Sequence, residues 1–286
     1  MCGIAGVFGY QRQQKIDVEL VQRMSRSIVH RGPDGEGMRI GPGYILAHRR
    51  LAIVDIAGGA QPMTLPDERL WLTFNGEIYN YVELRNELAA TGVTFRTKSD
   101  SEVLLHGYRA WGTGLAAKLR GMFSFVIVDE DKHELYAARD RVGKKPLYWC
   151  EHEGQFVFGS ELKALRQVPR QWQLRADAVA QFLALRYVPD PLTVFEDAHK
   201  LPPAHWLHVQ GGRVSQQRYW QLEFEPDHRP REWHRDEVLR QLDDAVSVRL
   251  MGEVPIAPFL SGGVDSYAVV DSMVRNGGNA VEACTV

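Results

Sequence analysis

The sequence predicts an α+β sandwich of sheets with helices on the outside, followed by the opening of a parallel α/β domain. Two observations indicate the first fold. Several strand-like apolar runs lie before and after two or three amphipathic helices, and glycine- or proline-containing loops separate them. A third observation indicates the second fold, because after residue 235 the pattern changes to strand, glycine-rich loop, helix and strand.

Short apolar runs, caps and loops predict the strands and helices of the first fold along the chain. Residues 3–8 form a short apolar run that is typical of a buried strand. Asp17 can cap a helix whose apolar residues recur every three or four positions, and this helix ends before the loop at residues 30–35. We expect further strands at residues 44–47, 70–74, 123–128, 134–138, 147–150 and 155–159, and helices around residues 84–88, behind residues 99–101 and at 176–185.

The second fold begins after a polar stretch. Residues 223–235 contain two prolines and several charges, which indicates a linker. Because one βαβ unit cannot bury both faces of a parallel sheet, we expect this second domain to be truncated. Pro255 and Pro258 interrupt its first strand, where prolines are disfavoured. The expected order is helix 237–250, strand 254–260, loop 261–266, helix 267–275 and strand 281–286.

The composition limits the classes of partner and compartment. A net charge of −2 gives no reason to expect nucleic acid or an anionic membrane as a partner. No apolar stretch has the length of a transmembrane helix, and the N-terminus lacks the pattern of a signal peptide. The three cysteines have neither metal-ligand nor redox spacing. We therefore expect a cytoplasmic protein.

The second residue is the first candidate for chemistry. Removal of Met1 would leave Cys2 with an α-amine beside its thiol, and these groups ordinarily titrate near pH 8 and 8.5. The amine can then accept the thiol proton, so that nucleophile and base lie on one residue. The alternative is an early cysteine at the start of a buried strand.

A second motif, Phe-Asn-Gly-Glu-Ile-Tyr-Asn at residues 74–80, ends a predicted strand and enters a helix. The amide of Asn75 and the N–H of Gly76 form a suitable pair of donors for the oxyanion of a tetrahedral acyl intermediate. The alternative is the hairpin turn that Asn-Gly often makes.

Three charged residues are candidates for binding an amino-acid substrate. Arg50 can bind a carboxylate with its bidentate guanidinium, or it can be an ordinary surface arginine. Glu77 and Asp100 can hold an ammonium group, or they can serve as a charge at a helix start and as a helix cap.

A third motif, Ser-Gly-Gly-Val-Asp-Ser at residues 261–266, lies between a predicted strand and a helix start. Glycines let backbone N–H groups approach an anion, and a helix N-terminus favours negative charge. The serines add hydroxyl donors, and Asp265 can hold Mg²⁺ beside phosphates. The loop therefore predicts a phosphate site, against the alternative of a polar turn.

Together with His-Arg-Gly-Pro-Asp at residues 30–34 and the N-terminal Cys-Gly-Ile, these motifs resemble, in this order, the glutamine-hydrolysing asparagine synthetases. The resemblance implies an N-terminal-nucleophile αββα sandwich of four layers and the first βαβ unit of a synthetase domain. It implies a class II glutamine amidotransferase domain at 2–215, a linker at 216–235 and a partial ATP-pyrophosphatase domain at 236–286. A relative that amidates carboxylates during assembly of cell-surface polymers also fits.

The resemblance also implies a mechanism and a set of site residues. Cys2 would attack the side-chain amide of glutamine and release ammonia through a thioester, without a cofactor, and Asn75 and Gly76 would form the oxyanion hole. Arg50 would bind the glutamine carboxylate, and Glu77 and Asp100 its α-amine. The remaining residues of the glutamine pocket would be Leu51, Ala52, Ile53 and Val54.

In the family, ammonia then reaches a carboxylate, usually aspartate, that ATP has adenylated. The resemblance implies ATP and Mg²⁺ as cofactors, no membrane or nucleic-acid partner, and a homodimer. Asp265 is the candidate Mg²⁺ ligand. The residues expected to bind ATP are Leu260, Ser261, Gly262, Gly263, Asp265, Ser266 and Val286.

Two other functions stay open at the level of the sequence. One is a stand-alone glutaminase, against which the abrupt end within a βαβ unit argues because exposed strands invite aggregation. The other is a non-catalytic fragment that retains the fold as an interaction module. The complete set of Cys2, Arg50, Asn75, Gly76 and Asp100 argues against this fragment.

Overall fold

The computed structural model describes residues 1–66, 69–277 and 281–285. The chain forms two compact units. The N-terminal unit comprises Met1–Ala52 and Ile56–Gln221, and the C-terminal unit comprises Ile53–Asp55 and Leu222–Val286.

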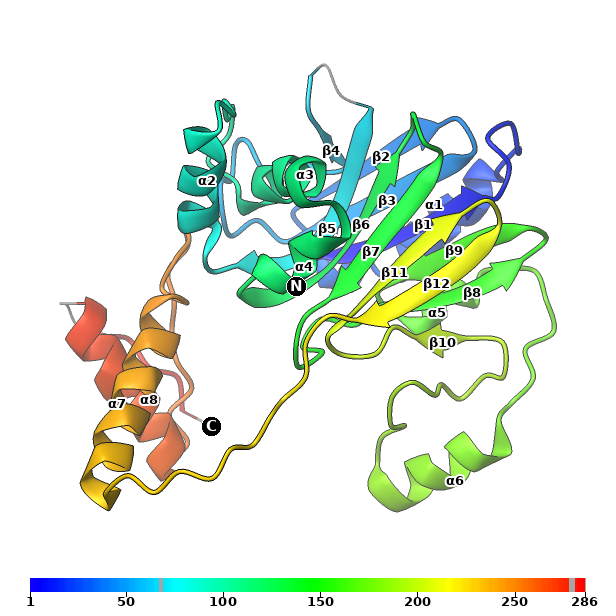
Figure 1. The fold of residues 1–286 in the computed structure, drawn as a ribbon. Coiled ribbons are helices and arrows are strands. Elements are labelled where there is room, and N and C mark those ends of the chain that lie inside the picture. The colour runs from blue at the N-terminus through cyan, green and yellow to red at the C-terminus, as the bar shows by residue number, and fades with distance from the viewer. Residues whose placement is uncertain (67–68, 278–280, 286) are drawn as a thin grey trace. The chain divides into compact units, whose positions relative to one another are not determined.

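Two mainly antiparallel sheets form the centre of the N-terminal unit (Figure 1). The first has the strand order β10-β8-β9-β1-β3-β2. Its strands are β1 (Gly3–Gly9), β2 (Gly35–Gly41), β3 (Tyr44–Arg50), β8 (Tyr148–His152), β9 (Gln155–Gly159) and β10 (His199–Lys200).

The second sheet has the order β12-β11-β7-β6-β5-β4. Its strands are β4 (Met63–Thr64), β5 (Leu70–Ile78), β6 (Gly121–Asp129), β7 (Glu134–Arg139), β11 (His205–Gln210) and β12 (Arg213–Arg218). The helices of this unit are α1 (Val18–Ser27), η1 (Val29–Arg31), α2 (Tyr81–Ala90), α3 (Asp100–Trp111), η2 (Gly112–Gly114), α4 (Leu115–Lys118), α5 (Leu162–Leu165) and α6 (Ala176–Leu185).

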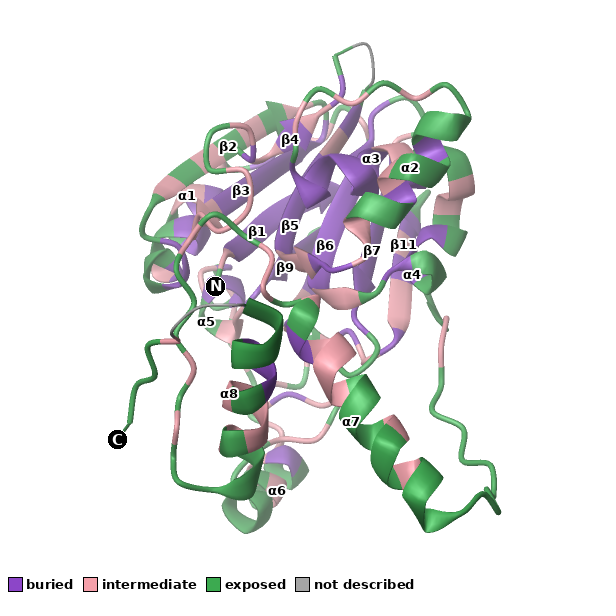
Figure 2. Cartoon of the chain, turned by 90° about the vertical axis from the view of Figure 1, so that its left-hand side faces the viewer, coloured by how far each residue is buried: buried purple, intermediate pink, exposed green. Residues whose placement is uncertain are grey.

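Three apolar clusters join these elements into four layers. One cluster packs α1 and α5 on the outer face of the first sheet, and a second packs α2, α3 and α4 on the outer face of the second sheet. The third lies between the sheets and includes Ile4, Phe8, Val126, Val128 and Leu207. The predicted α+β sandwich, αββα in layer order, is therefore confirmed. Buried residues concentrate in the central strands (Figure 2).

Most predicted elements of this unit form as expected. Asp17 caps α1, where its carboxylate accepts the N–H of Glu19 at 2.9 Å. The expected strands at 44–47 and 70–74 are the first parts of the longer β3 and β5. The prediction missed β2, which begins at Gly35, the last residue of the expected loop, and contains three glycines in seven residues. Glycine is depleted in strands, so this segment lacks the usual strand signal.

Residues 74–80 do end a strand and lead into a helix, but the strand is longer than the expected 70–74. β5 continues to Ile78, and Asn75 and Gly76 pair with Ser124 and Phe123 of β6. Helix α2 begins only at Tyr81. This strand pairing also rules out the Asn-Gly hairpin turn.

The C-terminal unit contains two helices, α7 (Arg231–Ser247) and α8 (Val264–Gly277), that pack against each other. Helix α7 begins six residues before the predicted helix at 237, within the expected linker. Helix α8 begins at Val264 rather than at the expected residue 267.

Within the described residues, the two predicted strands of the C-terminal unit, at 254–260 and 281–286, do not form ladders, and Val286 lies outside those residues. Phe259 and Cys284 make one isolated parallel bridge, in which Leu260 N donates to Cys284 O at 2.8 Å and Cys284 N donates to Pro258 O at 2.9 Å. A proline has no N–H to donate, so Pro255 and Pro258 each remove a ladder hydrogen bond from the first of these segments. In the part of the chain that the structure describes, no helix is long and apolar enough to span a membrane.

Candidate active site

The alternation of side chains along two strands positions the candidate site. In β1, Ile4 and Phe8 point into the layer between the sheets, whereas Ala5 and Val7 pack on the helix side. Cys2 precedes Ile4 by two residues and therefore falls on the inter-sheet side. In β5, Phe74 packs on the helix side, so Asn75 belongs to the inter-sheet side. The two sheets thus direct the predicted nucleophile and the predicted oxyanion donor toward the same layer.

The thiol of Cys2 lies against the backbone of Leu51. Leu51 N donates to Cys2 Sγ at 3.3 Å, and the thiol lies 3.5 Å from Leu51 O. Burial raises the pKa of the Cys2 thiol, while the Leu51 hydrogen bond and the positive charges of the N-terminal amine, Arg50 and Lys145 oppose this rise. The buried thiol therefore needs a base that takes its proton as it attacks.

The N-terminal amine has two cations as neighbours. Partial burial lowers the pKa of the Met1 amine, and the positive charges of Lys145 and Arg31 lower it further. Met1 itself is 55% exposed and thus accessible to an aminopeptidase. Its removal would leave an amine on Cys2 beside the same cations, where the neutral, proton-accepting form is favoured.

The amide of Asn75 is buried and has no hydrogen-bond partner. Asn75 is 1% exposed, and neither Oδ1 nor Nδ2 of its side chain has a partner within the described residues. A buried amide without partners costs about 1–3 kcal/mol, which is the kind of strain that a bound ligand removes. A donor held in this way is suited to a charge that appears only during a reaction.

His48 lies deeper in the same layer. Its Nδ1 is 3.3 Å from Thr73 Oγ1, and its Nε2 has no partner among the residues that the structure describes. Burial and the charge of Arg50 lower the pKa of His48 to about 3, so its ring is neutral at physiological pH. The sequence interpretation assigned no role to this residue.

Gly76 is required by the close approach of β6. A Cβ atom at this position would lie 2.1 Å from Met122 O, and its φ of +156° is a conformation that other residues rarely adopt.

The segment after β3 holds part of the predicted glutamine pocket. Arg50 donates from Nη1 to Ile56 O at 2.8 Å, and Ala52 N donates to Asp34 Oδ2 at 2.9 Å. Ile53 and Val54 belong instead to the C-terminal unit, where Ile53 O accepts the N–H of Glu253 at 2.9 Å.

Asp100 and Glu77 bring two carboxylates close together. Ser99, not Asp100, caps α3 through its hydroxyl, and the buried Asp100 carboxylate accepts the N–H of Ile78 at 2.9 Å. Burial raises the pKa of Asp100 to about 7, and the negative charge of Glu77 adds to the rise. An ammonium group near both carboxylates would relieve this electrostatic cost.

Lys145 is a buried cation that the sequence interpretation missed. It is 5% exposed, and within the described residues no carboxylate lies within ion-pair distance of its ammonium. Its backbone is held on both sides, because its N–H donates to Asp140 at 2.9 Å and its carbonyl accepts from Arg139 at 2.9 Å. Burial lowers the pKa of Lys145, while the charges of Glu77 and Cys2 oppose this change.

Comparison with known proteins identifies the family. Residues 1–220 match the model of the glutamine amidotransferase domain. The chain belongs to this family. Residues 237–286 match the model named asparagine synthase.

Two glutamine-hydrolysing asparagine synthetases of Bacillus subtilis illustrate the similarity. Asparagine synthetase 1 is 40% identical over 277 residues, which cover 94% of this chain and 43% of the relative. Asparagine synthetase 3 is 36% identical over 274 residues, which cover 94% and 44%. The chain thus spans less than half the length of these curated relatives.

A solved structure supports the fold alone. A glutamine phosphoribosylpyrophosphate amidotransferase of B. subtilis superposes with a TM-score of 0.58 at 17% identity, and the alignment covers 99% of this chain and 65% of that one. The N-terminal unit therefore shares the fold of that amidotransferase.

The glycine-rich loop lies in the C-terminal unit, and Asp265 and Ser266 belong to the first turn of α8. The hydroxyls of Ser261 and Ser266 are 3.2 Å apart, and Ser266 Oγ donates to Gly263 O at 2.9 Å. Gly262 has a φ of +79°, and an added Cβ there would contact nothing within 4 Å. Val286 lies outside the described residues, so its predicted contact has no structural counterpart here.

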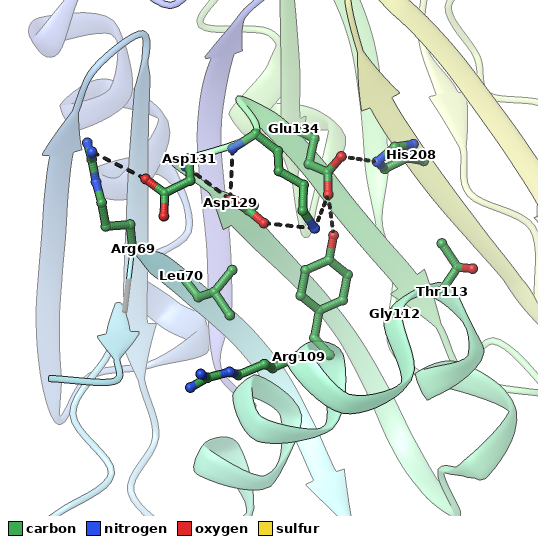
Figure 3. A pocket seen from close by; sticks show the side chains of 11 residues that line it. Arg69, Leu70, Arg109, Gly112, Thr113, Asp129, Asp131, Glu134 and His208 are labelled. Atoms are coloured by element: carbon green, nitrogen blue, oxygen red, sulfur yellow. Dashed lines mark hydrogen bonds and ion pairs between the residues drawn. The ribbon is translucent and has the colours of Figure 1, made fainter. Parts of the chain in front are cut away.

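The N-terminal unit has a polar hollow of about 420 Å³ at the opposite end of β6 from the Asn75 pairing (Figure 3). At its centre the buried Glu134 accepts hydrogen bonds from Tyr108 at 2.9 Å and from Lys132 at 3.2 Å. His208 lies 3.3 Å from the same carboxylate. The Glu134 carboxylate is thus satisfied by its neighbours. We assign this cluster the structural role of linking α3, β7 and β11.

The raised pKa of Asp100 predicts a pH dependence of stability. Because its folded-state pKa of about 7 exceeds the ordinary 3.8, the neutral carboxyl favours the fold, and this contribution is lost as pH rises from about 4 through about 7. The limiting slope is about 1.4 kcal/mol per pH unit. The free energy of unfolding, measured with urea, should fall with pH across this range by up to this slope in the wild type. It should show no such fall in Asp100→Asn. Parallel pH profiles would contradict the assignment.

Lys145 should increase the reactivity of Cys2 toward alkylating agents. In Lys145→Met the thiol loses a neighbouring cation and its pKa rises, so alkylation by iodoacetamide near neutral pH should slow by about 3- to 10-fold. Peptide mapping would separate Cys2 from Cys150 and Cys284. Lys144→Met is the matched control, because Lys144 is exposed. Equal rates in the two variants would show that the charge of Lys145 does not act on Cys2.

Proposed function

We propose that this chain carries the glutaminase of a glutamine-dependent amidotransferase of the asparagine synthetase type. In this proposal residues 2–215 form the glutaminase domain, 216–235 a linker and 236–286 part of a synthetase domain. One observation carries the proposal: the Cys2 thiol and the unpartnered amide of Asn75 face the same layer between the sheets.

The reaction begins at Cys2 after loss of Met1. The sulfur attacks the side-chain carbonyl carbon of glutamine while the α-amine of Cys2 takes the thiol proton. Negative charge develops on the carbonyl oxygen, where Asn75 Nδ2 and the N–H of Gly76 donate to it. The C–N bond then breaks, the amine passes its proton to the leaving nitrogen, and ammonia departs from a thioester. Water hydrolyses the thioester to glutamate and restores the thiol.

The charges around the site fit the backbone groups of a free amino acid. Arg50 would bind the α-carboxylate, and Glu77 together with Asp100 would bind the α-ammonium. A bound ammonium would lower the pKa of Asp100 and stabilise its ionised form. Leu51 and Ala52 would complete the pocket.

The C-terminal loop would hold ATP as a second substrate. The N-terminus of the 14-residue helix α8, the open glycines and the two serine hydroxyls are a donor set that fits phosphates. Asp265 would hold Mg²⁺ with the phosphates, in keeping with the one or two carboxylates that this ion usually takes. The described residues contain no cluster of three potential metal ligands. Bound ATP would activate a carboxylate by adenylation.

The acceptor, compartment and assembly complete the proposal. We take aspartate as the acceptor carboxylate, with the ammonia from glutamine as its nitrogen source, and a homodimer as the assembly. The three cysteines form no disulfide, which suits a reducing cytoplasm. Light scattering of the purified chain would test the dimer, and AMP formation in the presence of aspartate and ATP would test the acceptor.

Ammonia release from glutamine tests the glutaminase directly. We expect activity in the purified chain once intact mass shows that Met1 is absent, and its loss in Cys2→Ala. A folded chain with a free Cys2 amine and no ammonia release would favour the non-catalytic module.

Asn75→Leu should separate stability from activity. The substitution replaces an unpartnered buried amide by an apolar side chain of similar size, so the free energy of unfolding should rise by about 1 kcal/mol. Loss of an oxyanion donor should lower kcat by about 10²- to 10³-fold. Urea unfolding and glutaminase assays would measure both effects. A marked loss of stability would show that the amide has a structural partner.

A further inference from the structure

A two-residue segment at the end of β9 holds the backbone beside the nucleophile. Ser160 forms two hydrogen bonds with Ile4, since Ile4 N donates to Ser160 Oγ at 3.0 Å and Ser160 N donates to Ile4 O at 2.9 Å. Ile4 is two residues from Cys2, and Ser160 is completely buried. The start of β1 is thus fixed to the segment that carries Glu161.

Glu161 contacts three basic side chains, and one of them contacts Cys2. Its Oε1 accepts from Arg31 Nη1 at 3.0 Å and lies 2.9 Å from His30 Nε2, while Lys163 Nζ is 3.0 Å from Oε2. Arg31 is 8% exposed, and its Nε donates to Cys2 O at 2.9 Å. A continuous series of polar contacts therefore runs from Glu161 through Arg31 to the backbone of the nucleophile.

The contact at the Cys2 carbonyl bears on both reacting groups of that residue. The thiol and the α-amine are attached to the same Cα as the carbonyl, so holding the carbonyl restricts the directions in which both can point. Arg31 also places a positive charge near the amine. Without Glu161, this buried guanidinium would lose its anionic partner and would be drawn toward water.

We infer that Glu161 is a positioning residue for Cys2: it holds Arg31 on the Cys2 carbonyl and thereby orients the amine and the thiol for attack. The inference rests on the proposed function where it concerns turnover. Its structural content, the orientation and charge environment of Cys2, is independent of the substrate.

The reactivity of Cys2 provides a test that does not require turnover. In protein lacking Met1, the rate of Cys2 alkylation should rise with pH as the thiol ionises. Five charged or titratable groups surround the thiol and the amine: the amine itself, Arg31, Arg50, Lys145 and Asp34. Glu161→Gln should shift the pH dependence of the alkylation rate measurably, because Arg31 is no longer held at the Cys2 carbonyl. A purely structural role would lower thermal stability and leave the profile in place.

Turnover provides the second readout. In Glu161→Gln we expect kcat for ammonia release to fall by about 10- to 100-fold with KM within about threefold, because orientation and not substrate binding is lost. Glu161→Asp should recover part of kcat. Lys163→Met is the matched control, since it removes another partner of the same carboxylate that does not contact Cys2, and its kcat should stay within about twofold.

The outcomes separate the inference from the proposed function. A wild type that releases no ammonia, with Glu161→Gln still shifting the alkylation profile, would overturn the glutaminase and support the positioning role. An active wild type with an unchanged profile and kcat in Glu161→Gln would overturn the positioning role alone. Equal losses in Lys163→Met and Glu161→Gln would also overturn it. Near-ultraviolet circular dichroism confirms folding, and Glu161→Asp replaces any variant that does not fold.

Discussion

The face-to-face packing of two antiparallel sheets determines which side chains meet at the candidate site. Their inner faces share one apolar layer, in which Ile4 and Phe8 of β1 meet Val126 and Val128 of β6. Because side chains alternate along each strand, this packing also decides which polar residues face inward at the edge of the layer. A shift of one residue in the β5–β6 register would turn Asn75 toward α3 and away from the site of Cys2.

Burial then sets the charge states of the groups that this packing brings together. The layer contains a neutral His48, an amide without partners at Asn75 and a buried ammonium at Lys145. Asp100, on the helix that covers the second sheet, has a raised pKa beside Glu77. Each feature costs folding free energy in the absence of a ligand. Their concentration around one cysteine is typical of a site whose interactions become complete when a charged substrate binds.

In the C-terminal unit, the glycine-rich motif forms the expected loop and helix start, but the expected sheet around it does not form within the described residues. The loop at 261–266 precedes a helix, as expected, yet only one parallel bridge connects its flanking segments. Parallel strands depend on neighbours and on helices over both faces. Two prolines weaken the first segment further. The phosphate-binding chemistry of the loop therefore follows from local sequence, whereas the sheet that would support it does not.

The sequence by itself determined the α+β sandwich class, most helices and strands, and the identity of Cys2, Asn75 and Asp100 as candidates, because these follow from local periodicity and short motifs. The four-layer arrangement was implied by the family resemblance. Tertiary structure alone decided that Asn75 lies within a strand and that Ser99 rather than Asp100 caps α3. It also decided that the charge of Lys145 acts on Cys2 and that Glu161 binds the arginine that contacts Cys2. Lys145 and Glu161 lie more than 140 residues from Cys2 in the sequence. Contacts over such separations depend on sheet pairing and burial, which no local pattern encodes.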